Sequence, residues 1–302
     1  MKTKGKKLYV IIPLLACCIL TAVYCLFFIL LEDRKAPIIE MTSDTVTVSV
    51  RDGQSALMKG VSATDDKDGD VTDSILIENI SAFTQDKTAT VTYVAYDSVG
   101  NASKASRTVV FTDYQSPKFG QTNALVFASN TSPDVLSFMT AEDKIDGDIS
   151  NRVKGTLLSE GTSLSHPGEH IIEFRVTNSM GDTRRITLPV DVYRPQEYNA
   201  RVDLTDYLVY VKAGEEFNPQ KYLNSLVVGS NEYLLDPVAN PEIKLYTNNY
   251  VSPAVNPSAT IVNATVKSDV DVTKPGVYSV TYTVDYDGRY TGFTRLNVVV
   301  EE

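Results

Sequence analysis

Two acidic segments of the chain carry the residue types best suited to holding a metal ion. The first reads ATDDKDGDVTD over residues 63–73, and the second reads AEDKIDGDISN over residues 141–151. Carboxylate oxygens are hard ligands, of which Ca²⁺ takes about six to eight. The aspartates concerned are Asp65, Asp68 and Asp70 in the first segment and Asp143, Asp146 and Asp148 in the second.

Further oxygen donors can complete these candidate calcium sites. Asp66 and Asp97 are available to the first segment, and Asn178 or Asp182 to the second. The spacing is not that of an EF-hand, because no Glu closes the loop. The second segment also carries Lys144 in place of Asp66, which puts a cation where another metal ligand would sit.

A second interpretation of the acidic segments needs no metal. Asp-Gly is a turn sequence, and aspartate side chains in turns accept hydrogen bonds from nearby backbone N–H groups. Thr72 and Ser150, near the ends of the two loops, can form hydrogen bonds of the same local kind. The sequence favours the turn and leaves Ca²⁺ as the candidate cofactor; no other cofactor is indicated.

Catalytic constellations are poorly represented. His166 and His170 are the only histidines, and the Pro-Gly pair between them breaks the helix on which a four-residue spacing would bring them together. No Gly-rich phosphate loop and no G-x-S-x-G nucleophile elbow occurs. We therefore predict no enzymatic activity.

Tyrosine is concentrated near the carboxyl end of the chain, where it can form a ligand-binding face. Tyrosine offers a large rigid surface with a polar tip. Tyr246 and Tyr250 are the candidate ligand-binding residues, whereas Tyr278 and Tyr282 alternate as core residues of a strand would. The absence of Trp weakens the case for a sugar-binding platform.

These candidate sites belong to a repeating chain. The two acidic segments lie 78 residues apart (Asp65 to Asp143), and self-similarity at such a distance indicates a tandem array. Each repeat opens near a proline: Pro37, Pro117 and Pro195. The third repeat lacks the acidic segment and carries an insertion of about 30 residues within 216–268.

Alternating apolar residues predict strands throughout the repeats. The clearest runs end each repeat, at 107–111, 186–192 and 296–300, and others lie at 45–50, 89–95, 170–176 and 277–284. Short strands of period two with turn signals between them are typical of β-sandwiches. Pro189 cannot donate to a ladder, so we predict an edge strand there.

A long apolar run precedes the repeats. Residues 9–31 contain no charged residue, and a helix of that length, roughly 35 Å, is sufficient to cross a bilayer. Four lysines precede the run, so the positive-inside rule puts the amino terminus in the cytoplasm and the body outside. We therefore predict an uncleaved signal-anchor in a single-pass cell-membrane protein.

Two other interpretations of the apolar run remain open. One is a cleaved signal peptide, although the run ends in Leu-Leu-Glu-Asp rather than in small residues. The other is a lipoprotein signal, since residues 14–17 resemble a lipobox ending in Cys17. Against it, apolar residues continue after Cys17 where a polar tether is expected.

Charge and cysteine content exclude further classes. The net charge is −10, and without the basic first 35 residues the body is more acidic still, which excludes nucleic acid as a partner. Cys17, Cys18 and Cys25 all lie in the apolar run, so the body contains no disulfide and no thiolate metal site.

Together these motifs resemble the tandem bacterial Ig-like surface-protein domains, which also occur beside insecticidal crystal toxins. The shared motifs are D-x-x-x-P, A-x-D-x-x-D-G-D-[VI]-[TS], a Pro-Gly turn before a strand, and the AYDSVGN sequence at residues 95–101. Residues 36–194 match well, and the third repeat matches only at its ends. The resemblance implies immunoglobulin-like sandwiches in a bacterial, extracytoplasmic setting, and it implies no activity.

The resulting prediction is an all-β protein of tandem Ig-like β-sandwiches after one transmembrane helix. Its parts are a basic cytoplasmic tail (1–8), the anchor helix (9–31), Ig-like domains 1 (36–113) and 2 (114–194), and a divergent domain 3 with the insertion (195–302). The predicted function is non-enzymatic binding, adhesion or spacing in the cell envelope, with a cell-wall, glycan or protein ligand on domain 3. An accessory subunit of a membrane-bound assembly or secretion machine is the alternative.

Overall fold

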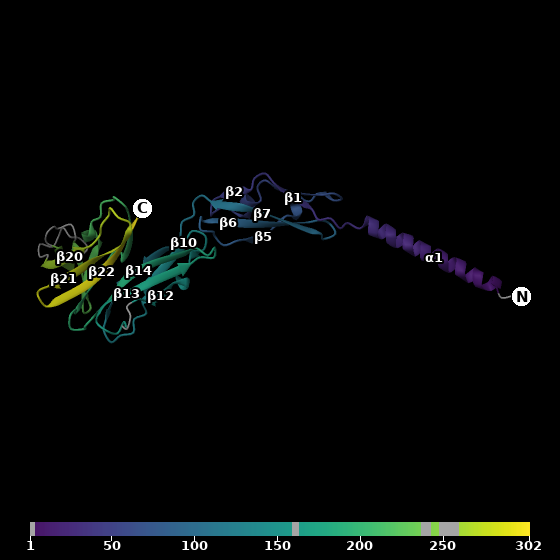
Figure 1. Cartoon of the computed structure of the whole chain (residues 1–302). Helices are drawn as coiled ribbons and strands as arrows, with labels where there is room; N and C mark the ends of the chain where they lie inside the picture. Colours follow the sequence, from purple (N-terminus) through teal and green to yellow (C-terminus); the bar gives the residue numbers. More distant parts are fainter. Residues whose placement is uncertain (1–3, 159–162, 237–242, 248–259) are drawn as a thin grey trace. The chain divides into compact units, whose positions relative to one another are not determined.

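The computed structural model describes residues 4–158, 163–236, 243–247 and 260–302. Within these ranges, side chains are described except at 4–11, 28–31, 236, 243–247 and 260–263. The chain is mostly β and forms two compact units, Met1–Thr112 and Asp113–Glu302 (Figure 1). The predicted boundaries of three domains stay predictions.

The first unit begins with helix α1, Lys4–Leu31, which includes Pro13. A helix over the predicted apolar run is thereby confirmed. Among the residues that the structure describes, no helix combines the length and hydropathy needed to cross a membrane.

Two sheets follow α1 in the first unit. One has the order β1-β3-β4, and the other β2-β7-β6-β5, in which only β2 and β7 pair in parallel. The elements are β1 (Ile38–Met41), β2 (Thr45–Val48), α2 (Gln54–Leu57), β3 (Val61–Asp65), β4 (Gly69–Asp70), the 3₁₀ turn η1 (Thr72–Ser74), β5 (Leu76–Ile80), β6 (Thr88–Tyr96) and β7 (Ala102–Phe111).

The alternating pattern of the sequence explains which side chains form the core of this unit. In β6, Val91, Tyr93 and Ala95 are each 0% exposed, as their shared strand face predicts. Arg107 of β7 is also buried, and it donates to the Tyr93 hydroxyl and to the carbonyl oxygens of Leu57 and Lys59. The buried cation is therefore held by hydrogen bonds, as burial of a charge requires.

The second unit repeats this topology in its first half. Its two sheets have the orders β11-β10-β8 and β12-β13-β14-β9, again with one parallel pair, β9 and β14. The elements are β8 (Lys118–Gln121), β9 (Val126–Ala128), η2 (Val135–Phe138), β10 (Met139–Asp143), β11 (Gly147–Asp148), η3 (Ser150–Arg152), β12 (Lys154–Leu157), β13 (Gly168–Thr177) and β14 (Thr183–Tyr193).

The prediction that Pro189 lies in an edge strand is wrong for β14 as a whole. This strand lies between β13 and β9 in its sheet. The short β9 pairs only with Asp191–Tyr193, however, and Pro189 comes before that pairing begins. A strand can thus be internal to a sheet and still leave one stretch without a neighbour where proline is tolerated.

The second half of this unit forms one sheet of eight strands. Its order is β15-β17-β18-β19-β20-β21-β22-β16, and an additional pairing joins β15 to β22. Its elements are β15 (Ala200–Leu204), β16 (Leu208–Lys212), η4 (Pro219–Tyr222), β17 (Leu223–Val228), β18 (Asn231–Asp236), β19 (Ile243–Thr247), β20 (Thr260–Ser268), β21 (Gly276–Tyr286) and β22 (Tyr290–Glu301). Strands β17 to β20 all lie within the range 216–268, in which the insertion is predicted.

The two halves of the second unit share side chains across their boundary. Val299 of β22 packs in the core of the first half, together with Phe119 and Phe174. The Tyr210 hydroxyl donates to the Phe119 carbonyl and accepts from its N–H, both at 3.0 Å. These contacts explain why residues 113–302 form one compact unit.

Candidate functional site

The first acidic segment forms the turn between β3 and β4. Asp65, the last residue of β3, accepts hydrogen bonds on Oδ1 from the N–H groups of Lys67 (2.8 Å) and Asp68 (3.0 Å). Gly69 has φ of +76°, a conformation that favours glycine because it carries no Cβ. This is the Asp-Gly turn that the sequence favours.

The outer aspartates of this segment are tied to neighbouring backbone. Asp68 accepts from the N–H (2.7 Å) and hydroxyl (2.9 Å) of Ser98. Asp70 accepts from the N–H of Thr72 at 2.9 Å, and the hydrogen bonds from Thr72 lower the pKa of Asp70. Asp70 therefore stabilises the turn in its ionised form, and Asp68 joins the turn to Ser98.

Asp97 organises the neighbouring turn after β6. Its Oδ1 accepts from the N–H groups of Val99 (3.0 Å) and Asn101 (2.7 Å), and its Oδ2 accepts from the Asn101 side-chain amide (2.6 Å). Partial burial raises the pKa of Asp97, but the hydrogen bonds from Asn101 and its neighbours outweigh burial and hold this pKa below its usual value.

The second acidic segment repeats the same hydrogen bonds between β10 and β11. Asp143 Oδ1 accepts from Ile145 (2.9 Å) and Asp146 (3.0 Å), and Asp146 accepts from the N–H (2.7 Å) and hydroxyl (2.5 Å) of Ser179. Asp148 accepts from Ser150, which lowers the pKa of Asp148. The repeat in sequence is thus a repeat in three-dimensional structure.

The hydrogen bonds of the leading aspartate differ between the two turns. Asp143 Oδ2 accepts a hydrogen bond from Asn178 Nδ2 at 3.0 Å. The corresponding oxygen, Asp65 Oδ2, is buried and has no hydrogen-bond partner among the residues that the structure describes. Asp97 takes the sequence position of Asn178 and, as a carboxylate, has no proton to donate.

The structure brings Asp65 together with Asp33 and Asp66 rather than with Asp68 and Asp70. One carboxylate oxygen from each of Asp33, Asp65 and Asp66 lies within 4.8 Å of the other two, a spacing that can hold a metal ion. Asp33 was not among the sequence candidates, although the shared D-x-x-x-P opening of the repeats contains it. The predicted calcium ligands as a set stay a prediction.

The predicted ligand-binding tyrosines fall largely outside the described residues. Tyr246 lies in β19 opposite Leu234, but its side chain is outside the described part of the chain, as is the whole of Tyr250. Their predicted role in binding is therefore untested. His170 is buried, and its Nε2 lies 2.9 Å from the backbone oxygen of His166.

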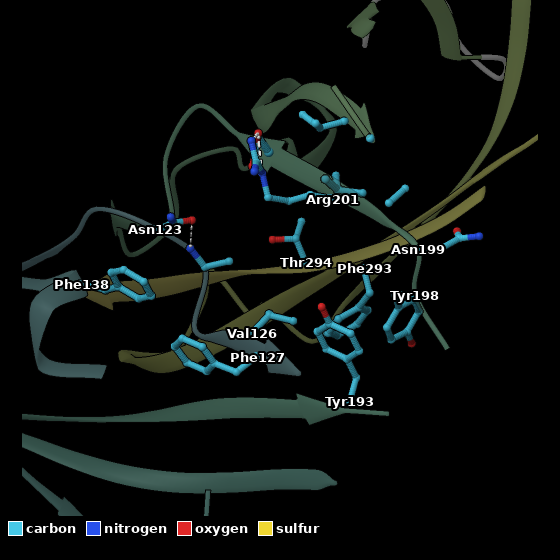
Figure 2. A pocket seen from close by; sticks show the side chains of 16 residues that line it. Asn123, Val126, Phe127, Phe138, Tyr193, Tyr198, Asn199, Arg201, Phe293 and Thr294 are labelled. Atoms are coloured by element: carbon cyan, nitrogen blue, oxygen red, sulfur yellow. Dashed lines mark hydrogen bonds and ion pairs between the residues drawn. The ribbon is translucent and has the colours of Figure 1, made fainter. Parts of the chain in front are cut away.

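A pocket of about 450 Å³ opens in the second unit, between its two halves. Five partly exposed aromatic side chains line it: Phe127 of β9, Phe138 of η2, Tyr193 of β14, Tyr198 of the following link and Phe293 of β22. Figure 2 shows Tyr193, Tyr198 and Phe293 gathered at one side and Phe127 and Phe138 at the other. No single run of the sequence contains these rings.

The aromatic rings of the pocket are held against one another. Tyr198 meets Tyr193 edge-on, with ring centroids 5.3 Å apart, and stacks on Phe293 at 5.4 Å. Phe127 and Phe138 stack at 5.7 Å with nearly parallel planes. Such arrangements are favourable for aromatic pairs, so the rings are oriented without any ligand.

Polar groups lie beside these rings. Arg201 donates to both carboxylate oxygens of Asp203, with Nε–Oδ1 and Nη2–Oδ2 distances of 2.9 Å, so the two charges cancel locally (Figure 2). The exposed amides of Asn123 and Asn199 line the same pocket. Apolar surface with a few polar groups is the usual composition of a ligand pocket.

Sequence comparison finds little that is related to this chain. No protein-family model matches it. A stretch of 100 residues is 37% identical to an uncharacterized 81.3 kDa protein of Acholeplasma phage L2. That match covers 33% of this chain and 13% of the phage protein, so the chain spans only a small part of that relative.

Structural comparison finds cadherin domains among the similar solved structures. Drosophila N-cadherin EC1-4 is 13% identical, with 90% of this chain and 76% of that chain covered and a TM-score of 0.23. Mouse Cadherin-23 EC22-24 is 12% identical, with 89% and 99% covered and a TM-score of 0.20. The CBM51-2 and INT domains of Clostridium perfringens ZmpB are 19% identical, with 51% and 41% covered and a TM-score of 0.21. At TM-scores near 0.2 these similarities indicate nothing about the function of this chain.

Proposed function

We propose that this protein is a non-enzymatic binding protein of the bacterial cell envelope and that the aromatic pocket of the second unit is its ligand site. The observation that carries the proposal is the pocket itself, in which five partly exposed rings from separate elements line one opening of about 450 Å³. Leaving large apolar rings partly exposed is unfavourable in water, so a cluster of them marks a binding surface.

The lining favours an uncharged saccharide as ligand. Sugar rings present apolar C–H faces, which fit against aromatic rings, and hydroxyl edges, which fit amides and charged side chains. The pocket offers both, and its Arg201–Asp203 pair leaves no net local charge to attract an ionic ligand. Because the chain has no Trp, Tyr and Phe would supply the stacking surface.

The setting of this site is part of the same proposal. The uncharged run at residues 9–31 would anchor the chain in the membrane, with the basic amino terminus inside and residues 32–302 outside. The paired sheets of residues 36–113 and 114–194 would be Ig-like sandwiches, with 195–302 as the divergent third domain. The repeat motifs and the shared strand order support this assignment.

Binding of the purified full-length chain, kept in detergent, to an array of neutral oligosaccharides tests the proposal. We expect retention on at least one glycan, and Tyr198→Ala should weaken it about tenfold, the equivalent of 1.4 kcal/mol for a lost stacking partner. Tyr290→Ala is the matched control, because this partly exposed ring stacks on Tyr286 and does not line the pocket.

Two outcomes would contradict the proposal. One is that the wild-type chain binds no glycan on the array. The other is that Tyr198→Ala and Tyr290→Ala weaken binding equally, which would place the ligand elsewhere. Binding to a peptide array in place of the glycans, lost on Tyr198→Ala, would keep the pocket and reject the saccharide.

A further inference from the structure

A second site, unrelated to the aromatic pocket, is formed where the link after α1 meets the first acidic turn. Asp33 lies two residues beyond the end of α1, and Asp65 and Asp66 lie at the end of β3. Their three carboxylates each contribute an oxygen within 4.8 Å of the others. An acidic cluster alone indicates no ligand, so the surroundings of these carboxylates decide whether they bind one.

The buried member of the cluster lacks a partner. Asp65 is 8% exposed, and its Oδ2 has no hydrogen-bond donor in the described part of the chain. A buried carboxylate oxygen without a donor or counter-ion is strongly unfavourable. Its other oxygen is already used by the N–H groups of Lys67 and Asp68, so the carboxylate is held in place with one oxygen unsatisfied.

The second acidic turn shows how the same fold satisfies this oxygen without an ion. There Asn178 supplies the donor to Asp143 Oδ2, and Lys144 replaces the carboxylate of Asp66. The first turn has Asp97 and Asp66 at these two positions. The two turns therefore share a backbone, and at two positions the first has a carboxylate where the second has an amide donor, Asn178, and an exposed lysine, Lys144.

From this difference we propose that Asp33, Asp65 and Asp66 bind one calcium ion and that the second turn binds none. Calcium–oxygen bonds of about 2.3–2.6 Å allow two ligand oxygens to lie up to roughly 5 Å apart, which the 4.8 Å limit satisfies. Magnesium demands near-ideal octahedral geometry and gives up its waters reluctantly, so a group of three carboxylates suits it less well than calcium. Waters would complete the coordination.

The charge around the site fits a divalent ion. The three carboxylates carry three negative charges, and Lys35 Nζ, 2.6 Å from Asp66 Oδ2, supplies one positive charge. The Lys35 side chain is 76% exposed, so it is free to leave when calcium enters.

Calcium at this position would join the link to the body of the first unit. At present the Asn101 amide holds the Asp33 carbonyl at 3.2 Å, and Lys35 bridges to Asp66. An ion shared by Asp33 and the β3 residues adds a stronger connection between the same segments. The expected consequence is a stiffer connection between α1 and the first sheets.

Calorimetric titration of the full chain in detergent, stripped with EDTA and titrated with CaCl₂, tests this proposal. We expect one calcium per chain and weaker binding of MgCl₂. Asp66→Asn should weaken calcium binding at least about tenfold, because affinity follows the number of charged ligands. Lys35→Met should strengthen it, because it removes the competing ammonium. All variants change exposed residues, so the fold should persist.

Asp70→Asn is the matched control, since it removes the same charge from the same turn outside the three-carboxylate group. It should leave the calcium affinity close to that of the wild type. The proposal is overturned if the wild-type chain gives no calcium heat, if Asp70→Asn weakens binding as much as Asp66→Asn, or if Lys35→Met leaves the affinity unchanged. None of these results depends on glycan binding.

Discussion

Replacing Arg295 by methionine should destabilise the second unit far more than the same replacement at an exposed arginine. Arg295 of β22 donates to both carboxylate oxygens of Asp191 in β14, with Nε–Oδ2 and Nη2–Oδ1 distances of 2.6 and 2.8 Å. The two side chains are only 11% and 14% exposed. Methionine keeps most of the aliphatic stem, so the variant removes chiefly the charge.

The magnitude follows from the carboxylate that remains. Burial raises the pKa of Asp191, and the hydrogen bonds from Arg295 oppose this effect. Breaking one side of a buried ion pair costs about 3–5 kcal/mol. We expect a loss of about 3 kcal/mol in the free energy of unfolding, because Asp191 can take up a proton. For a unit of this size that lowers the midpoint by roughly 6–12 °C.

Urea and thermal unfolding of the purified chain measure this loss, and Arg185→Met is the control. Arg185 donates to Glu173 at 2.7 Å between neighbouring strands, but its side chain is 54% exposed, so we expect less than about 1 kcal/mol. The loss at Arg295 should also shrink in acid. In the variant the folded-state pKa of Asp191 lies above its unfolded value of about 3.9, so the folded state gains protons first as the pH falls.

Equal losses for Arg295→Met and Arg185→Met would refute the reasoning, because burial would then not decide the cost. A loss at Arg295 that stays constant between neutral pH and pH 4 would refute it as well. In that case the change would come from lost packing rather than from an uncompensated carboxylate.

Two further predictions concern the turns and the core. The hydrogen bonds from Thr72 and Ser150 hold the pKa values of Asp70 and Asp148 below their usual range, so their stabilisation is complete above about pH 4 and is lost as the pH falls through the folded pKa values. The thermal midpoint should therefore drop in acid, and Asp70→Asn with Asp148→Asn should flatten this drop; an unchanged pH profile would contradict the turn role. Leu188→Ala, at a side chain 0% exposed, should cost about 2–5 kcal/mol in urea unfolding, and Leu158→Ala, at one 49% exposed, about 0.5 kcal/mol or less. Similar losses for the two leucines would show that Leu188 does not lie in the core of the second unit.

The repeat made much of the fold predictable. Alternation in the runs around Tyr93, Phe174 and Tyr282 predicts strands with those rings on the buried face, and all three are 0% exposed. The Asp-Gly turns were predictable for the same reason, since the hydrogen bonds of Asp65 and Asp143 connect residues two or three positions apart. Local interactions leave local sequence signals.

The partners of the candidate sites were less predictable. Asp33 joins Asp65 across a separation of 32 residues, and neither residue's neighbours in sequence indicate the other. The aromatic pocket combines Phe127 with Phe293, whereas the concentration of tyrosine pointed to Tyr246 and Tyr250. Pro189 is a similar case, because it lacks an N–H and the extent of β9 decides whether the strand needs a donor at this position.

The amino-acid sequence by itself determined the apolar helix, the strand periodicity, the acidic turns and their duplication, because each depends on residues close together in the chain. Tertiary structure alone decided that the second and third repeats share a core, that their junction opens into an aromatic pocket, and that the buried oxygen of Asp65 lacks the donor that Asp143 has. These features depend on which side chains meet across distant strands, and that pairing is a property of the packed fold rather than of any segment.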